Sequence, residues 1–207
     1  MEIILASASP RRAELLQQIG IKYRVEPSCI TEGQPFSPWP EWVQRLAQQK
    51  ALAVPAEKGD VVLGADTIVV HSGEVLGKPK DKQEAQVMLR KLSGSNHQVM
   101  TGVCVAHYQE ETPQVKTAVE ITQVTFRHLT EKEIINYVAS GESLDKAGAY
   151  GIQGLGALLV ERIQGCYFNV VGLPLVKIMQ LLRSCGVPIL GEDYHEKADS
   201  NSQRLSD

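Results

Sequence analysis

The chain has 207 residues and a mass of 22.7 kDa, a length that suits one domain or two small lobes sharing a sheet and needs no disulfide or metal to fold. Its 43% apolar and 22% charged residues exclude wholesale disorder, and its net charge of −3 argues against a surface for nucleic acid. No apolar run reaches the ~18 residues of a membrane span, and the N-terminal arginines follow the apolar stretch, the wrong order for a secretion signal. We therefore expect a cytoplasmic protein without nucleic-acid or membrane partners.

The first seventy residues predict an alternation of strands and helices. Ser9 is a suitable N-cap, Pro10 suits the first helical position and Gly20 supplies a stop, so a helix is expected between them. A loop that holds four of the ten prolines is expected over 27–40. Strands are expected over 2–6, 21–25 and 60–70, and a second helix over 41–53.

Two later helices carry start signals that can be read directly. Asp81 and Thr130 each stand three residues before a glutamate, Glu84 and Glu133, so each can open a helix with a capping box. Gly141 then ends the second of these helices. We therefore expect one helix to begin at Asp81 and the other at Thr130.

A long antiparallel hairpin is expected in the second half of the chain. The β-rich segments 97–107 and 115–127 flank a turn-prone stretch between them. A strand over 157–163, a last helix from near Leu173 and a loose polar tail over 191–207 follow. Together with the earlier elements, this order predicts a mixed α/β protein.

The segment from Ser7 to Arg12 surrounds an expected helix N-terminus with two hydroxyls and two guanidiniums. Free N–H groups and the helix dipole favour an anion there, and arginine adds bidentate phosphate contacts. The alternative is an ordinary capped helix with solvated arginines.

Asp66 lies between apolar residues of the strand expected over 60–70. A carboxylate in such a place is costly unless it meets a partner or a metal ion. The alternative is a bulge in the strand at which Asp66 caps a turn.

Two further segments could approach a phosphate ligand. Lys78 and Lys80 lie beside Gly77 and Pro79 in a loop expected over 73–81, although such lysines are often simply solvated. Residues 145–156 hold four glycines within nine positions, which allows sharp turns or close contact with a ligand. This second segment fits neither of the common nucleotide-binding glycine patterns, and a flexible hinge is the alternative.

Other chemistries are poorly supported. The five histidines show no metal-binding spacing, and no G-x-S-x-G motif indicates a serine nucleophile. The four cysteines lack a C-x-x-C pattern, so neither a zinc site nor a disulfide framework is indicated. Cationic side chains, one carboxylate and a glycine-rich loop instead favour attack by water on a polyphosphate, assisted by a divalent cation.

Six blocks of the sequence resemble, in order, the Maf family of nucleoside triphosphate pyrophosphatases. They are ASASPRRAELLQQIG, VVLGADTIVV, LGKPKD, LSGSNHQVMTGV, KAGAYGIQG and GCYFNVVGLPL. The resemblance implies an α/β fold like that of inosine triphosphate pyrophosphatases, with a long mixed β-sheet between two lobes and the substrate in a central cleft. Residues 1–190 would then form a single catalytic domain.

The resemblance also implies roles for particular residues. Asp66 would be the proton acceptor and Lys78 a second catalytic residue, while Glu32 and Asp66 would bind Mg²⁺ or Mn²⁺. Base selection is implied at Arg11, Thr67 and Gln153. The residues implied in substrate or phosphate binding are Ser7, Ser9, Arg11, Arg12, Lys50 and Lys146.

The activity implied is hydrolysis of a nucleoside triphosphate to the monophosphate and pyrophosphate, in housecleaning of the nucleotide pool by a homodimer. KAGAYGIQG is similar to the subgroup that acts on dTTP and UTP. The alternatives are a 7-methyl-GTP pyrophosphatase and a nucleotide-binding regulator of cell division. The chain departs from the family where Ile30-Thr31-Glu32 lacks the first carboxylate of an Asp-Glu pair, and where Cys166 replaces a serine.

Overall fold

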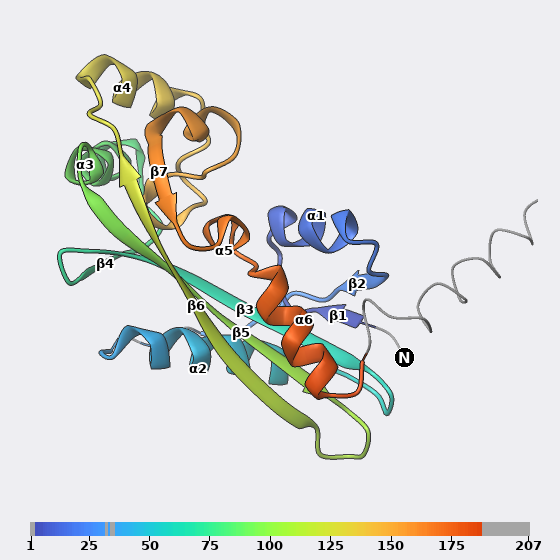
Figure 1. The fold of residues 1–207 in the computed structure, drawn as a ribbon. Coiled ribbons are helices and arrows are strands. Elements are labelled where there is room, and N and C mark those ends of the chain that lie inside the picture. The colour runs from blue at the N-terminus through green and yellow to red at the C-terminus, as the bar shows by residue number, and fades with distance from the viewer. Residues whose placement is uncertain (1–2, 32, 34–35, 188–207) are drawn as a thin grey trace, which may run out of the picture.

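The computed structural model describes residues 3–31, 33 and 36–187, which fold around one mixed β-sheet (Figure 1). The strand order is β2-β1-β3-β5-β6-β7, and β4 pairs with β3 beside this path. The strands are β1 (Ile3–Leu5), β2 (Tyr23–Val25), β3 (Val61–His71), β4 (Glu74–Leu76), β5 (Asn96–His107), β6 (Gln114–Phe126) and β7 (Val160–Gln164). The helices are α1 (Pro10–Gln18), α2 (Trp39–Leu52), α3 (Lys82–Leu92), α4 (Glu131–Ala139), α5 (Tyr167–Val171) and α6 (Leu175–Ser184), with the 3₁₀-helices η1 (Ala147–Ala149) and η2 (Gly154–Leu159). The fold has the mixed α/β class expected from the sequence.

Three long antiparallel strands form the centre of the sheet. β5 and β6 pair continuously from Asn96 opposite Thr125 to His107 opposite Gln114, which confirms the predicted hairpin. β3 runs antiparallel to β5 over residues 61–70. β1 joins β3 and β2 in parallel, because helices rather than tight turns connect these strands.

Helices cover both faces of this sheet. α2 lies on one face, where Ala47 packs with Val62 of β3. α1, α5 and α6 lie on the other face (Figure 1), where Leu16 of α1 and Ile178 of α6 share a core with Leu63. Neighbouring residues of β3 thus belong to opposite layers, as the alternation of side chains along a strand requires.

Two glycines allow α2 to approach the sheet closely. A Cβ atom on Gly64 of β3 would lie 2.1 Å from the backbone oxygen of Ala47. A Cβ atom on Gly102 of β5 would lie 2.2 Å from the backbone oxygen of Val43. Any side chain at either position would therefore push the helix away from the strands.

The helix starts follow the predicted caps, with one difference in detail. Thr130 and Glu133 form the complete capping box expected of α4. Asp81 accepts the N–H of Glu84, but the Glu84 carboxylate accepts the N–H of the residue before Asp81, so this box is only half formed. Ser9 is the N-cap of α1 as expected, without a side-chain bond to the helix.

Several short elements differ from the sequence-based expectation. β4 lies in the loop expected over 73–81, because its three residues are held by pairing with β3 rather than by a local pattern. The strand expected over 157–163 begins at Val160, because η2 occupies the preceding residues. α5 was not expected, and α2 begins at Trp39, inside the loop expected over 27–40.

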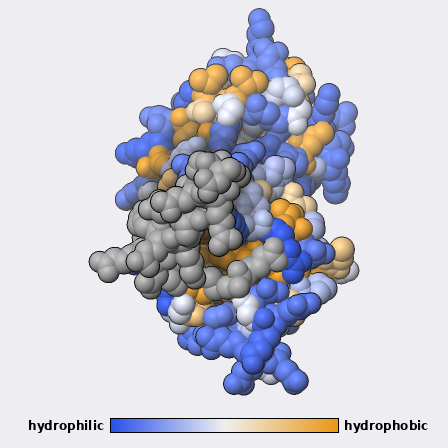
Figure 2. Space-filling view, turned by 90° about the vertical axis from the view of Figure 1, so that its right-hand side faces the viewer, coloured by the Kyte–Doolittle hydropathy of each residue, from blue (hydrophilic) through white to orange (hydrophobic). Residues whose placement is uncertain are grey.

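The polar tail predicted over 191–207 lies outside the described residues. Within the described part of the chain, no helix combines the length and apolar character needed to cross a bilayer. The face seen in Figure 2 is mostly hydrophilic, with smaller groups of apolar side chains between the polar ones.

Candidate active site

A pocket of about 770 Å³ opens beside β3. β1 pairs with β3 only as far as Leu63, and β4 pairs with it only from Val69 onward. The intervening residues 64–68 therefore form a stretch of strand edge that neither neighbour covers, and Asp66, Thr67 and Ile68 line the pocket. The pocket is thus built on an interruption in strand pairing.

The structure brings all the described candidate residues to this pocket. They come from segments far apart in the sequence, and Glu32 lies outside the described residues. The candidate residues in the pocket lining are Ser7, Ser9, Arg11, Arg12, Lys50, Asp66, Thr67, Lys78, Lys146 and Gln153. Their proximity is consistent with one shared site, while the role of each residue stays a prediction.

Asp66 lies in the middle of β3, not in a loop or bulge. The pairing of β3 with β5 continues through this position without a break, so the turn-capping alternative is wrong. The residue is only 8% exposed, and its Oδ1 lies 2.6 Å from Lys50 Nζ of α2. The close approach of α2 over Gly64 and Gly102 thus places a lysine against the mid-strand carboxylate.

Arg11 and Arg12 are neighbours in the chain but have different surroundings. The Arg12 guanidinium donates to the oxygens of Gly172 and Ala65 and to the hydroxyls of Ser7 and Thr67, at 2.8–3.1 Å. It therefore ties α1 to the edge of β3 and to the segment between α5 and α6. This geometry favours a positioning role for Arg12 over direct phosphate binding.

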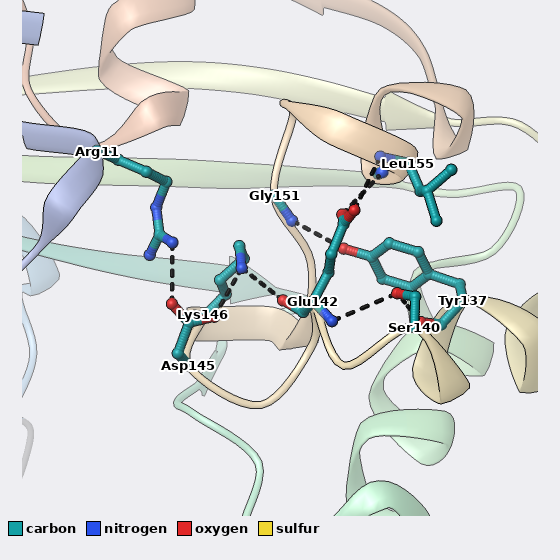
Figure 3. Close-up of polar contacts among 9 residues, drawn as sticks. Arg11, Tyr137, Ser140, Glu142, Asp145, Lys146, Gly151 and Leu155 are labelled. Carbon is teal, nitrogen blue, oxygen red and sulfur yellow. Dashed lines mark hydrogen bonds and ion pairs between the residues drawn. The ribbon is translucent and has the colours of Figure 1, made fainter. Parts of the chain in front are cut away.

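Arg11 instead reaches the glycine-rich segment. Its Nη1 lies 2.9 Å from Asp145 Oδ2, and Asp145 Oδ1 also accepts a hydrogen bond from Lys146 at 2.6 Å (Figure 3). Burial alone would raise the pKa of Asp145, but hydrogen bonds from Lys146 and Arg11 outweigh it and lower the pKa. The carboxylate is thus charged at neutral pH and faces two of the predicted substrate-binding cations.

The glycine-rich segment is anchored by hydrogen bonds (Figure 3). Tyr137 Oη accepts the N–H of Gly151 at 3.2 Å, and the Glu142 carboxylate accepts the N–H groups of Leu155 and Gly156. A Cβ atom on Gly156 would lie 1.9 Å from the oxygen of Gly151, so this close turn requires glycine. These contacts favour a shaped wall of the pocket over the hinge alternative.

A buried aromatic cluster underlies this wall. Tyr150 lines the pocket, and its hydroxyl lies 2.7 Å from His97 Nε2, with the ring of Phe126 packed edge-on against both. Burial, assisted by the charge of His71, lowers the pKa of His97 to about 4. His97 is therefore a neutral core residue at physiological pH.

The carboxylates available to a divalent cation are few. Among the described lining residues the acidic ones are Asp66 and Asp145, and the described part of the chain contains no group of three or more His, Cys, Asp or Glu residues placed to hold a metal ion. Mg²⁺ in phosphate-processing sites is commonly held by one or two carboxylates together with substrate phosphates. The residues present would fit a cation that arrives with the substrate.

Sequence reasoning did not assign a role to two residues of this region. Asp145 pairs with Arg11 across 134 positions of the chain, and Thr101 of β5 meets the hydroxyl of Thr67. Neither contact has a signal in local sequence pattern, because both depend on how distant elements meet.

The chain is similar to known proteins over most of its length. The model of the family described as Maf-like protein matches residues 2–185. The chain is 48% identical over 190 residues to a dTTP/UTP pyrophosphatase of Syntrophomonas wolfei, covering 90% of this chain and 98% of that protein. It is 49% identical to a dTTP/UTP pyrophosphatase of Escherichia coli O157:H7, covering 94% and 98%, and 51% identical to one of Symbiobacterium thermophilum, covering 91% and 96%. Among solved structures, a HAM1 protein from Coxiella burnetii matches with a TM-score of 0.43 and 16% identity, covering 72% of this chain and 86% of that one.

Proposed function

Because the chain belongs to the family of Maf-like proteins, we propose that it hydrolyses dTTP and UTP to the nucleoside monophosphate and pyrophosphate. The observation that carries this proposal is the Asp66–Lys50 pair inside a pocket that also holds Arg11, Lys78 and Lys146. A carboxylate beside several cations suits a polyphosphate that must be held while water attacks. Relatives named dTTP/UTP pyrophosphatase support the choice of substrates.

Asp66 is the proposed proton acceptor. A strand holds its carboxylate in place, and the Lys50 ammonium fixes one of its oxygens. A water beside this carboxylate can lose its proton as it attacks the α-phosphorus, and pyrophosphate then leaves. A divalent cation bound by Asp66 and Glu32 together with the phosphates would withdraw charge from the phosphate oxygens during this step.

The cations of the lining balance the charge of the leaving pyrophosphate. Lys78 follows β4 and lines the pocket from that side, while Arg11 and Lys146 lie at the glycine-rich wall (Figure 3). Because the negative charge of the leaving group grows in the transition state, the contact of Lys78 should act mainly on kcat.

Base selection is proposed at Gln153 and Thr67. The Gln153 amide offers both a donor and an acceptor, which can match O4 and N3–H of uracil or thymine. Both residues line the same pocket as Asp66. The family resemblance further supports a cytoplasmic homodimer that acts on free nucleotides in pool housecleaning.

A nucleotide panel with product analysis tests this function. We expect dTTP and UTP to give monophosphate and pyrophosphate, with CTP, GTP and 7-methyl-GTP turned over less. Gln153→Glu removes the amide donor and adds a negative charge, so dTTP and UTP should lose kcat/KM relative to the guanine nucleotides.

Three results would point elsewhere. A preference for 7-methyl-GTP would favour that subgroup, and nucleotide binding without pyrophosphate release would favour the regulatory role. Equal losses for all five substrates in Gln153→Glu would mean that Gln153 only shapes the pocket wall.

A further inference from the structure

A chain of hydrogen bonds crosses the sheet from the pocket to α5. Thr67 of β3 and Thr101 of β5 are directly opposed, and their hydroxyl oxygens lie 3.0 Å apart. Thr101 Oγ1 lies 3.1 Å from the backbone oxygen of Asn169 in α5. Thr67 lines the pocket, whereas Thr101 is fully buried. The hydrogen bonds of the buried Thr101 therefore extend to Thr67, whose side chain lines the pocket.

The partners of these hydroxyls determine the direction of each bond. Arg12 can only donate, so Thr67 accepts from Arg12 Nη2 at 3.1 Å. The carbonyl of Asn169 can only accept, so Thr101 donates to it. Because the Thr101 proton is used in this bond, the Thr101 oxygen accepts a hydrogen bond from the Thr67 hydroxyl. This arrangement satisfies both hydroxyl protons within the protein.

We propose that Thr101 is a positioning residue that turns the Thr67 hydroxyl so that Thr67 offers the substrate a lone pair and no proton. A threonine hydroxyl has one donor and two acceptor sites. Thr101 takes the donor and Arg12 takes one acceptor, which leaves one acceptor for a ligand. The inference rests on the proposed function, because it assigns a consequence for base selection at the same pocket.

The consequence is a preference between two pyrimidines of almost equal shape. Uracil and thymine present an N3–H donor, which the remaining lone pair of Thr67 can accept together with the Gln153 oxygen in a bifurcated hydrogen bond. Cytosine presents a lone pair at N3, which would face another lone pair. Leaving such polar groups unmatched in a buried site is strongly unfavourable. Thr101 thus contributes to selection of UTP over CTP without touching either nucleotide.

The kcat/KM ratio of UTP to CTP tests this inference in the full chain. Thr101→Val keeps the side-chain shape but frees the Thr67 proton to turn toward the substrate. The Asn169 carbonyl still accepts the N–H of Gly172 at 3.0 Å in this variant. We expect the UTP-to-CTP ratio to fall by about tenfold, mainly because CTP gains.

Two matched variants separate this effect from general damage. Thr101→Ser restores the hydroxyl and should restore the ratio. Thr122→Val removes another fully buried threonine hydroxyl of the sheet, which bonds to Asn169 and Cys166 but not to Thr67. Its UTP-to-CTP ratio should stay at the wild-type value even if its thermal stability falls.

If Thr101→Val fails to fold, Thr67→Val decides the question. This change removes the lone pair without adding a donor, so UTP turnover should fall while CTP turnover changes little. A wild-type protein that prefers UTP, combined with an unchanged ratio in the folded valine variants, overturns this inference and leaves the proposed function standing. A wild-type protein that releases pyrophosphate from neither nucleotide overturns both.

Discussion

Neighbouring residues of β3 beside the pocket present different kinds of polar group on the two faces of the central sheet. On the α2 face, Asp66 of β3 and Lys50 form a charged pair at 2.6 Å. On the face that carries α5, Thr67, Thr101 and the neutral His97 are held by uncharged partners, apart from the Arg12 guanidinium. Because neighbouring residues of a strand point to opposite faces, Asp66 and Thr67 can serve these two environments from consecutive positions.

The contrast indicates that the charged groups and the neutral groups have different roles. Charges are suited to the phosphates and to the proton of the attacking water, because their interactions are strong and do not depend on fine orientation. Neutral hydroxyls and amides are suited to distinguish bases, because each presents a defined donor or acceptor. The β3 backbone keeps the Asp66–Lys50 pair apart from the Thr67–Thr101 pair, so that a change at one pair should leave the other largely intact.

The charged face gives the largest test of this separation. Asp66→Asn keeps the side-chain shape but cannot take a proton, so kcat should fall about 10²–10⁴-fold. Asp60→Asn is a matched control. Asp60 lies just before β3, and its carboxylate accepts the backbone N–H of Glu57 instead of pairing with Lys50. Pyrophosphate release at saturating Mg²⁺ and UTP measures the effect. Near wild-type rates in Asp66→Asn would remove the proton-acceptor role.

A second test concerns the close packing of α2 against the sheet. Gly64→Ala would bring a Cβ atom within 2.1 Å of the Ala47 oxygen, so the free energy of unfolding should fall by about 3 kcal/mol. Gly77→Ala is the control for stability, because no atom lies within 4 Å of the added Cβ. Chemical denaturation measures both variants. Equal stability of the two would show that α2 can shift without loss.

The neutral face has a pH signature at His97. Its folded pKa of about 4 lies below the ordinary value of 6.5, so the unfolded chain takes up a proton first as pH falls. Stability is therefore complete above about pH 6.5 and decreases toward pH 4, by about 2 kcal/mol between pH 7 and pH 5. Denaturation at several pH values measures this slope. His97→Gln should lack this contribution, and an identical slope in both proteins would contradict a buried neutral histidine.

The smallest expected effect concerns the pair that spans the pocket. Asp145→Asn removes the carboxylate that engages Arg11 and Lys146 (Figure 3), so both cations should bind phosphate more readily and KM should fall about threefold. The side chain of Asp145 is 58% exposed, so stability should change by less than about 1 kcal/mol. Steady-state kinetics at low ionic strength measures KM. A rise in KM would mean that Asp145 orients Arg11 for the substrate instead of competing with it.

The sequence carries the local features of the fold most clearly. The capping box of Thr130 and Glu133 and the hairpin of β5 and β6 depend on residues close in the chain or on a regular alternation, and both were predicted. β4, α5 and η2 were missed because elements of three to six residues are stabilised by their tertiary contacts.

The site was predictable in its residue types more than in its contacts. A carboxylate at Asp66 inside an apolar strand and arginines at a helix start signalled phosphate chemistry. The resemblance to a family then supplied most other positions. The pairing of Lys50 with Asp66 and the bonds of Arg12 and Thr101 could not be predicted, because they arise where β3, β5, α1 and α2 come together.

The main chain sets the length of the unpaired edge of β3 beside the pocket. From Leu63, the last partner of β1, to Val69, the first partner of β4, the strand runs about 20 Å at the usual rise per residue. Extending β4 by two residues toward Thr67 would close part of this window with backbone hydrogen bonds. The length of this open edge is therefore set by where two short strands stop, and we expect that redesign of the site for larger or smaller nucleotides should begin with strand length before side chains are exchanged.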